Sequence, residues 1–322
     1  MEALDTAGLA DRLGYDELWV GEMATFDAFA LAAAIGRATV RIRCTLGPFP
    51  PAVRDPVSIA MGVASVAALT GRPTHVALGA SSPVVVERWH GRTFGRTATE
   101  LRRAAAELRS LLGGGRSTGG YRLRLPPPPA ASLTIAAFGP ATVRAAGELA
   151  DRMVINLCTP VATAALRAGL DAATQAAGRE RVRLAAWTPA AVDPTPDGIE
   201  QIRRGLVAYL AAPGYGEMFM AAGFTDVVAL ARSGRAPGEV LAAVPDELVH
   251  AVAAVGSAAE CRARLAAYVA AGVDEVVLVP VTAGDDGGER TLLALAPPPR
   301  GARPYEPDPA GPGPGHIPGG PP

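Results

Sequence analysis

One carboxylate in this sequence stands where it could do chemistry. Glu22 comes directly after the run ELWVG, residues 17–21, which is typical of a short buried strand. In α/β proteins built on parallel strands, functional residues lie where strands end and the next loops begin. The other predicted strand ends are small or neutral: Gly47-Pro48, Ala80-Ser81-Ser82, Gly139-Pro140-Ala141-Thr142, and Asn156 with Thr159. Glu22, with Asp27 slightly beyond it, is therefore the candidate acid or base.

Histidines and cysteines do not add a second catalytic group. His75 comes at the start of its predicted strand, away from the expected site, and His90 follows a predicted helix that it would cap or pack against. The three cysteines are far apart and odd in number, which favours reduced thiols over disulfides or a metal site. No Ser/His/Asp or Cys/His spacing is recognisable, and we expect no metal. A site this poor in acids and bases indicates that a cofactor carries the reactivity.

The basic residues exclude two further kinds of chemistry. All 30 of them are arginine, so the chain contains no lysine. Without lysine there is no Schiff base for pyridoxal-phosphate catalysis. There is also no lysine for a phosphate-binding P-loop.

Two of the strand ends could contact a cofactor through their backbone. Gly139-Pro140-Ala141-Thr142 opens a predicted helix with proline in its first turn, and free N–H groups at a helix N-terminus favour phosphate. On sequence alone an ordinary helix cap is the other explanation. Gly47-Pro48 ends another predicted strand, where the chain could bulge toward a flat ring.

The elements that position these residues alternate between strand and helix. Seven apolar runs predict strands, each followed by a helical pattern, which favours a parallel sheet with helical crossovers. We expect an α/β fold, a (β/α)8 barrel, with the first of its eight strands missing because the chain begins in a helix. A doubly wound open sheet is the alternative. Residues 213–255 predict a helical insertion before the last strand. We assign residues 1–297 to the barrel and 298–322 to a disordered tail rich in proline and glycine.

Composition and charge limit the kinds of molecule that this chain is expected to bind. The chain has 322 residues and a formal net charge of −1, which argues against nucleic acid or an anionic membrane as the main partner. No signal-peptide pattern and no apolar run long enough to span a bilayer is visible, so we expect a cytoplasmic protein without a membrane partner.

Several stretches, in order and spacing, resemble the luciferase-like flavin and deazaflavin oxidoreductases, and more narrowly their coenzyme F420-dependent branch in actinobacteria. The matching stretches are residues 13–22 (LGYDELWVGE), 54–56 (RDP), 76–79 (VALG), 87–91 (ERWHG), 136–140 (AAFGP), 146–151 (AGELAD) and 271–276 (AGVDEV). The resemblance extends to about Pro297.

The resemblance implies a (β/α)8 barrel, usually a homodimer, with the cofactor ring at the carboxyl-terminal mouth of the barrel. It implies a cis peptide at or beside Gly47-Pro48, ring contacts from Ala80, Ser81 and Ser82, and phosphate binding by Gly139, Pro140, Ala141 and Thr142. Asn156 and Thr159 would border the cofactor tail. Where some relatives carry an acid–histidine pair, this chain has Glu22-Met23, so proton transfer would fall to Glu22 or to the substrate, or be absent.

Three functions follow from these observations. The first is transfer of a hydride between coenzyme F420 and a small organic substrate. The second is an FMN-dependent monooxygenase, which needs a dry pocket to protect its oxygen adduct. The third, from another class, is a barrel that binds a flavin without catalysis.

Overall fold

A parallel sheet, curled into part of a barrel, forms the centre of the computed structural model, which describes residues 2–22, 25–95, 97–125 and 131–298. The strands are β1 (Glu17–Val20), β2 (Arg43–Phe49), β3 (Thr74–Leu78), β4 (Leu133–Ala136), β5 (Arg152–Asn156), β6 (Arg183–Val192), β7 (Ala254–Gly256) and β8 (Glu275–Pro280). The first six pair in chain order, and β7 and β8 both pair with β6. All these pairs are parallel.

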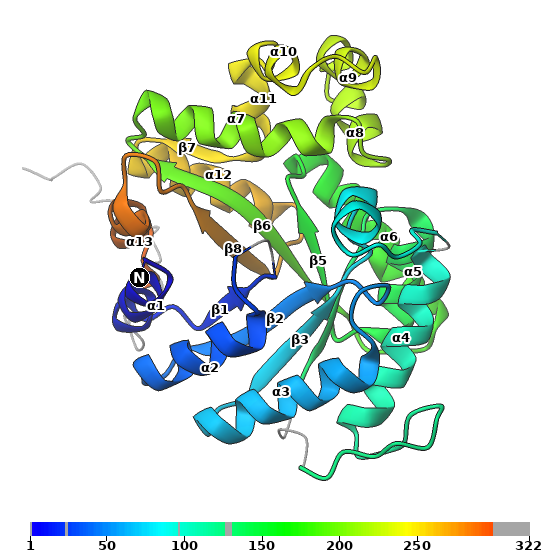
Figure 1. Ribbon diagram of the computed structural model, residues 1–322. Coiled ribbons are helices and arrows are strands. Elements are labelled where there is room, and N and C mark those ends of the chain that lie inside the picture. Colours follow the sequence, from blue (N-terminus) through cyan, green and yellow to red (C-terminus); the bar gives the residue numbers. More distant parts are fainter. Residues whose placement is uncertain (1, 23–24, 96, 126–130, 299–322) are drawn as a thin grey trace, which may run out of the picture.

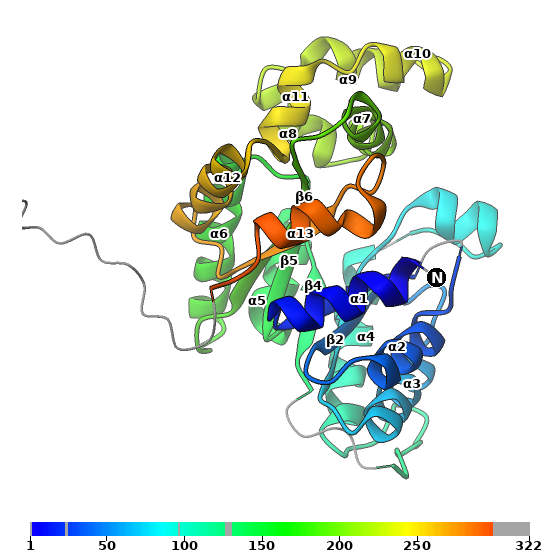
Figure 2. The same ribbon diagram turned by 90° about the vertical axis from the view of Figure 1, so that its left-hand side faces the viewer.

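Helices cover the outer face of this sheet (Figure 1). They are α1 (Glu2–Leu13), α2 (Ala28–Ala38), α3 (Pro56–Thr70), the π-helix η1 (Val84–Trp89), α4 (Thr97–Leu112), α5 (Pro140–Leu149), α6 (Pro160–Ala176), α7 (Pro196–Leu210), α8 (Tyr215–Ala221), α9 (Thr225–Arg232), α10 (Pro237–Ala242), α11 (Asp246–Val252), α12 (Ala258–Ala270), the 3₁₀ turn η2 (Asp286–Gly288) and α13 (Glu289–Ala294). In Figure 2, α1 and α13 lie side by side across one face. None of the described helices is long and apolar enough to cross a membrane.

The sequential strand order confirms the predicted alternation and excludes the doubly wound alternative. A doubly wound sheet reverses its strand order at a switch point, whereas here β1 to β6 follow one another. Residues 215–252 form four short helices, as the sequence pattern indicates. That pattern contains no sign of β7, because three residues are too few to show periodicity. The predicted disorder of 298–322 falls almost wholly outside the described residues.

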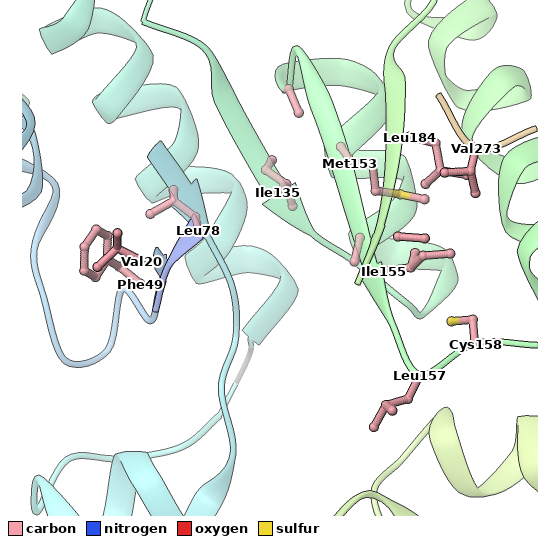
Figure 3. Close-up of a cluster of buried hydrophobic side chains, with 14 of the residues drawn as sticks. Val20, Phe49, Leu78, Ile135, Met153, Ile155, Leu157, Cys158, Leu184 and Val273 are labelled. Carbon is pink, nitrogen blue, oxygen red and sulfur yellow. The ribbon is translucent and has the colours of Figure 1, made fainter. Parts of the chain in front are cut away.

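Apolar side chains from the strands and the surrounding helices form one large core. Val20, Phe49, Leu78, Ile135 and Met153, from five successive strands, are all buried in it (Figure 3). Alternate strand residues point to opposite faces, so each strand contributes one set to the interior and one to the helices. This continuous packing fixes the strand ends, where the predicted site residues lie.

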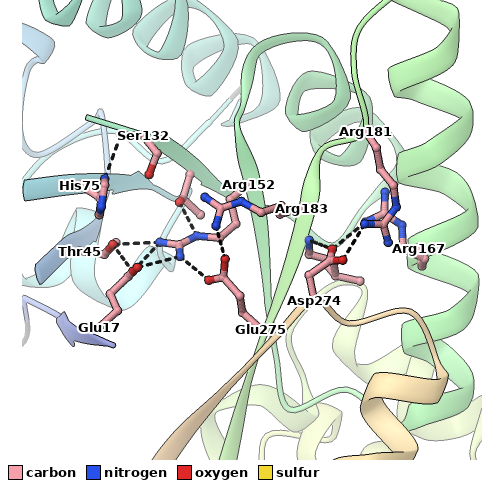
Figure 4. A network of polar contacts seen from close by, with 12 residues as sticks. Glu17, Thr45, His75, Ser132, Arg152, Arg167, Arg181, Arg183, Asp274 and Glu275 are labelled. Carbon is pink, nitrogen blue, oxygen red and sulfur yellow. Dashed lines mark hydrogen bonds and ion pairs between the residues drawn. The ribbon is translucent and has the colours of Figure 1, made fainter. Parts of the chain in front are cut away.

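A buried arginine organises the amino-terminal end of the sheet (Figure 4). The side chain of Arg152 on β5 is 0% exposed and binds Glu17 of β1 at 2.7 Å and Glu275 of β8 at 2.5 Å. The same guanidinium donates to Thr45 of β2 and Thr134 of β4. One side chain thus ties five strands together, as a charge in a buried position requires.

His75 lies at this same amino-terminal end, as the sequence predicts. Its Nδ1 accepts the backbone N–H of Ser132 at 3.0 Å, and burial lowers the pKa of its imidazole. His90 is an exposed residue at the C-cap of η1 and also fits its predicted structural role. All three cysteines are buried free thiols.

Candidate functional site

Glu22 lies just beyond β1 and is held by Arg54, which belongs to the matching stretch 54–56 but has no role assigned from the sequence. Arg54, in the loop before α3, binds the carboxylate in two places, with Nε 2.7 Å from Oε1 and Nη2 2.6 Å from Oε2. Oε2 also accepts the backbone N–H of Ala28 at 3.3 Å. A carboxylate offers about four acceptor positions, so one position on Oε1 is left.

Arg54 has further contacts that fix its place. Its Nη2 also contacts the carboxylate of Asp27, which caps α2 by accepting the N–H groups of Phe29 and Ala30. Its guanidinium lies 5.1 Å from the ring centre of Phe29 and 5.8 Å from that of Phe49. Hydrogen bonding to Glu22 is the largest cause that raises the pKa of Arg54. Partial burial acts to raise the pKa of Asp27, but hydrogen bonds from Ala30 and Arg54 leave it lowered.

The end of β2 has the unusual backbone that the resemblance implies. The Gly47–Pro48 peptide bond is cis, and the register between β2 and β3 shifts between Leu46 and Phe49. Gly47 has φ 106°, and a Cβ there would lie 2.4 Å from the carbonyl oxygen of Ala77. Only glycine fits such a position without strain.

Glycine at the end of β3 makes room for this bulge. A Cβ on Gly79 would lie 2.9 Å from Cβ of Pro48 and 3.3 Å from Cβ of Ala136 on β4. The Gly79 N–H donates to the carbonyl oxygen of Phe49 at 3.0 Å. The ends of β2, β3 and β4 therefore meet around Pro48.

The loop after β3 holds the predicted residues Ala80, Ser81 and Ser82. Ser81 is exposed and has φ 61°, a left-handed conformation that is uncommon outside glycine. The carbonyl oxygen of Ser82 accepts the N–H of Val86 at 3.0 Å, in the first turn of η1. Strained residues of this kind cluster at functional sites.

The start of α5 is open, as a phosphate site requires. Gly139 is the N-cap, no side chain caps this end, and a Cβ added to Gly139 would meet no atom within 4 Å. Pro140 and Ala141 are exposed. Both the hydroxyl and the N–H of Thr142 donate to the carbonyl oxygen of Gly139, at 2.9 and 3.0 Å. Pro140 has no N–H, so Ala141 carries the first N–H of the helix that has no acceptor among the described residues.

Asn156 and Thr159 follow β5, with Leu157 between them at φ 52°. Asn156 is hydrogen-bonded to Tyr209, whose pKa is nevertheless raised by burial. Thr159 is the N-cap of α6, and its Oγ1 accepts the N–H of Ala162 at 3.2 Å. Its hydroxyl proton has no acceptor among the described residues.

Aromatic rings that the sequence analysis did not single out connect the α5 start with the helices after β6. Phe138 stacks on Tyr215 with ring centres 4.5 Å apart, and Tyr215 lies 4.9 Å from Tyr209. Phe138 directly precedes Gly139, and Tyr209 contacts Asn156. These rings lie beside the loops that follow β4 and β5. Phe138 belongs to the matching stretch 136–140, whereas the positions of Tyr209 and Tyr215 carry no motif that could have identified them.

Two groups of contacts lie at the carboxyl ends of β1 to β5. One joins Glu22, Arg54, Phe49 and Gly79, and the other joins Phe138, Tyr215, Tyr209 and Asn156. The structure thus brings the predicted site residues to one end of the sheet. Among the described residues, no group of three or more His, Cys, Asp or Glu could hold a metal ion. The arrangement offers open backbone, one carboxylate and aromatic walls, which suits an organic cofactor with a phosphate.

Comparison with known proteins identifies the relatives of this chain. The profile of the luciferase-like monooxygenases matches residues 1–275. A Mycobacterium tuberculosis protein named "Putative coenzyme F420-dependent oxidoreductase" is 29% identical, and the match covers 89% of this chain and 92% of that protein. The resemblance noted in the sequence is confirmed.

Solved structures share the fold. The coenzyme F420-dependent tetrahydromethanopterin reductase of Methanopyrus kandleri superposes with a TM-score of 0.76 at 17% identity, covering 92% of this chain and 94% of that one. An F420-dependent secondary alcohol dehydrogenase gives 0.74 at 18% identity, covering 91% and 94%. The FMN-bound oxygenating constituent of a Pseudomonas putida diketocamphane monooxygenase gives 0.66 at 17%, covering 91% of each chain.

Proposed function

This chain belongs to the luciferase-like monooxygenase family of enzymes, and from that premise we propose that it transfers a hydride between coenzyme F420 and a small organic substrate. The observation that carries the proposal is the carboxyl-terminal end of the sheet, which holds both the Glu22 carboxylate bound by Arg54 and the open start of α5. The Mycobacterium relative named for coenzyme F420 supports the choice of cofactor. FMN is the alternative cofactor, because the FMN-bound diketocamphane monooxygenase constituent has a similar fold.

The residues present fit this cofactor. When bound, the deazaflavin supplies a ring carbon, C5, that accepts or gives the hydride. We propose that Gly47, Pro48, Ala80, Ser81 and Ser82 contact the ring. Gly139, Pro140, Ala141 and Thr142 would border the phosphate at the open helix start, where the N–H groups of Gly139 and Ala141 are the donors without an acceptor among the described residues. Asn156 and Thr159 would border the tail, Thr159 through its remaining hydroxyl proton.

Glu22 is the proposed catalytic residue. Oxidation of an alcohol releases a proton from its hydroxyl, and the remaining position on Oε1 of Glu22 can accept that proton. In the reverse direction the same atom returns it to the carbonyl oxygen. Arg54 and the Ala28 N–H occupy the other acceptor positions and hold the carboxylate in place. Positioned acids and bases contribute roughly 10²- to 10⁴-fold to rate.

We also propose that the fold is a (β/α)8 barrel whose first strand position is unfilled by the described residues, with the helices of 215–252 forming an insertion beside the mouth. The homodimer and the cytoplasmic location expected from the sequence stay predictions. The non-catalytic alternative loses its support, because the matching relatives include named oxidoreductases and monooxygenases.

A turnover experiment tests the function. The protein is mixed under argon with oxidised coenzyme F420 and a panel of small alcohols, and with the reduced cofactor and small ketones, while the cofactor absorbance is followed. We expect turnover without oxygen for at least one pair. With that pair, Glu22→Gln should lower kcat by roughly 10²-fold or more, leaving the cofactor Kd unchanged. Glu148→Gln, which removes an ion pair with Arg102 between α5 and α4, should leave kcat close to wild type. Oxygen consumption with reduced FMN and none of these turnovers would contradict the proposal.

A further inference from the structure

Two carboxylates at the start of α2 share one arginine. Nη2 of Arg54 lies 2.6 Å from Oε2 of Glu22 and also contacts Oδ2 of Asp27. Because both carboxylate oxygens contact the same nitrogen, they lie within about 6 Å of each other. The three side chains therefore form one charged group, which we call the Glu22–Arg54–Asp27 cluster.

The guanidinium of Arg54 is held in place by contacts other than those with Glu22. Phe29 and Phe49 stack on each other with ring centres 5.0 Å apart, and the guanidinium lies 5.1 Å from the first ring centre and 5.8 Å from the second. Asp27 binds the same guanidinium from the α2 side. We therefore expect Arg54 to keep its position when Glu22 takes up a proton.

Asp27 is itself fixed by the helix that it caps. Its Oδ1 accepts the N–H groups of Phe29 and Ala30 at 3.0 and 2.9 Å, while its Oδ2 contacts Arg54. The same helix start contacts Glu22, whose Oε2 accepts the Ala28 N–H at 3.3 Å. Both carboxylates thus lie at a helix N-terminus, where the N–H groups favour a negative charge.

The contacts of Glu22 act on proton uptake in opposite directions. Arg54 binds the carboxylate through two nitrogens and the start of α2 adds a third donor, and all of these favour its ionised form. A carboxylate held only by such groups accepts a substrate proton poorly. Asp27 acts the other way, because its negative charge competes for Arg54 and repels the charge on Glu22.

The charges in the cluster change when Glu22 takes up a proton. The cluster begins with two negative charges and one positive charge, and proton uptake leaves one of each. Without Asp27, the same step would turn a neutral ion pair into an unpaired guanidinium, and the Arg54 side chain is only 26% exposed. A partly buried charge is costly to leave unpaired. Asp27 therefore makes proton uptake by Glu22 easier.

Three charged side chains come from the elements packed around Glu22. The start of α2 contributes Asp27, the loop before α3 contributes Arg54, and the start of α3 contributes Asp55. Asp55 has partners of its own, because it accepts two N–H groups of α3 and the hydroxyl of Ser58. Asp27 is thus the carboxylate that shares the arginine with Glu22.

We propose that Asp27 is a positioning residue for proton transfer: it competes with Glu22 for Arg54 and so keeps the Glu22 carboxylate able to take up the proton that a substrate releases. This inference rests on the proposed function only for the source of that proton. Asp27 acts through Arg54, and Glu22 remains the residue that meets the substrate.

A carboxyl titration followed by NMR tests the inference in the protein without cofactor. Asp27→Asn should move the midpoint of the Glu22 titration to lower pH by about 0.5 to 1 pH unit, because a negative charge within about 6 Å is removed. Asparagine caps a helix about as well as aspartate, so the start of α2 should be preserved. Arg54→Met should move the same midpoint to higher pH by about 1 pH unit or more.

Asp55→Asn is the matched control. Asp55 caps α3 as Asp27 caps α2, with the same pattern of accepted N–H groups, but it binds Ser58 where Asp27 binds Arg54. Its loss should move the Glu22 midpoint less than half as far as the loss of Asp27. An unchanged or higher midpoint in Asp27→Asn, or an equal shift in Asp55→Asn, would overturn the proposal.

Turnover gives a second readout that a purely structural role would not move. With an alcohol that the enzyme oxidises, the acid limb of kcat/KM against pH should shift in Asp27→Asn by the same amount as the NMR midpoint. The plateau should fall roughly two- to threefold, because a weaker base accepts a proton more slowly. A shifted midpoint with an unshifted pH profile would overturn the link to proton transfer. A shifted midpoint in a protein without any turnover would contradict the proposed function but support the effect of Asp27 on Glu22.

Discussion

The two ends of the sheet carry different kinds of polar group. At the amino-terminal end, Arg152 is fully buried and its guanidinium is saturated by Glu17, Glu275, Thr45 and Thr134. At the carboxyl-terminal end, the start of α5 has no side-chain cap, and three residues other than glycine, Ser81, Leu157 and Asp193, have positive φ in the loops that follow strands. Polar groups whose hydrogen bonds are all made within the protein stabilise the fold. Backbone N–H groups without a partner, and residues in strained conformations, are available to a ligand.

The comparison predicts that the largest loss of stability comes from the amino-terminal end. Arg152→Met should lower the free energy of unfolding by about 3 kcal/mol, because two partly buried carboxylates lose their shared partner. Arg183→Met is the matched control: this side chain is 49% exposed and also binds Glu275, so its loss should cost less than ~1 kcal/mol. Urea unfolding of the three proteins gives the values. A similar, small loss in both variants would show that the Arg152 contacts do not organise this end.

A smaller loss of stability is expected at the carboxyl-terminal end of the sheet, where a substitution changes the backbone conformation and not a buried charge. Gly47→Ala should destabilise by roughly 1–3 kcal/mol, because its positive φ and the close Ala77 carbonyl oxygen exclude a Cβ. Gly21→Ala, at the end of β1, is the control, since a Cβ there meets no atom within 4 Å. Thermal unfolding compares the two. Equal melting temperatures would mean that the backbone around Gly47 accommodates a Cβ without loss of stability.

The smallest effect concerns pH and His75. Burial lowers the pKa of this imidazole below its ordinary value of 6.5, so below that pH the unfolded chain binds more protons than the folded one. Stability should therefore fall as the pH drops from 6.5 toward the folded pKa. His75→Asn keeps an acceptor for the Ser132 N–H but removes the titration. Its loss of stability between about pH 7.5 and pH 5.5 should be smaller than that of the wild type, as measured by urea unfolding. An equal loss would assign the acid sensitivity to other groups.

The sequence predicted which residues lie at the carboxyl ends of the strands better than it predicted the side-chain contacts between them. Strand ends follow from apolar runs broken by glycine, so the amino-acid pattern alone places Glu22, Gly47 and Gly139 at one edge of the sheet. It does not place Arg54 there, because the contact of Arg54 with Glu22 joins residues 32 positions apart in two loops. Tyr209 and Tyr215 were missed for the same reason: helical periodicity marks a buried face, not the element that it meets.

The edges of β1 and β8 show a second limit. Strand counting predicts seven strands where a barrel needs eight, but only the paired register shows which two strand edges have no partner among the described residues. The burial of Arg152 also cannot be predicted from the pattern of apolar residues, because a charged residue at the start of a strand is normally exposed. Its burial depends on carboxylates from β1 and β8, which are distant in sequence.

The claim that the carboxyl-terminal end is a phosphate-bearing cofactor site is tested most directly by Gly139→Asp. Aspartate is a better N-cap than glycine by a few tenths of a kcal/mol, so the melting temperature should hold or rise slightly. Its carboxylate would occupy the open start of α5 and repel a phosphate. Fluorescence titration should show micromolar binding of coenzyme F420 to the wild type, much weaker binding of FMN, and at least tenfold weaker F420 binding to the variant. Unchanged F420 affinity in a stable Gly139→Asp protein, or no binding to the wild type, would contradict the account.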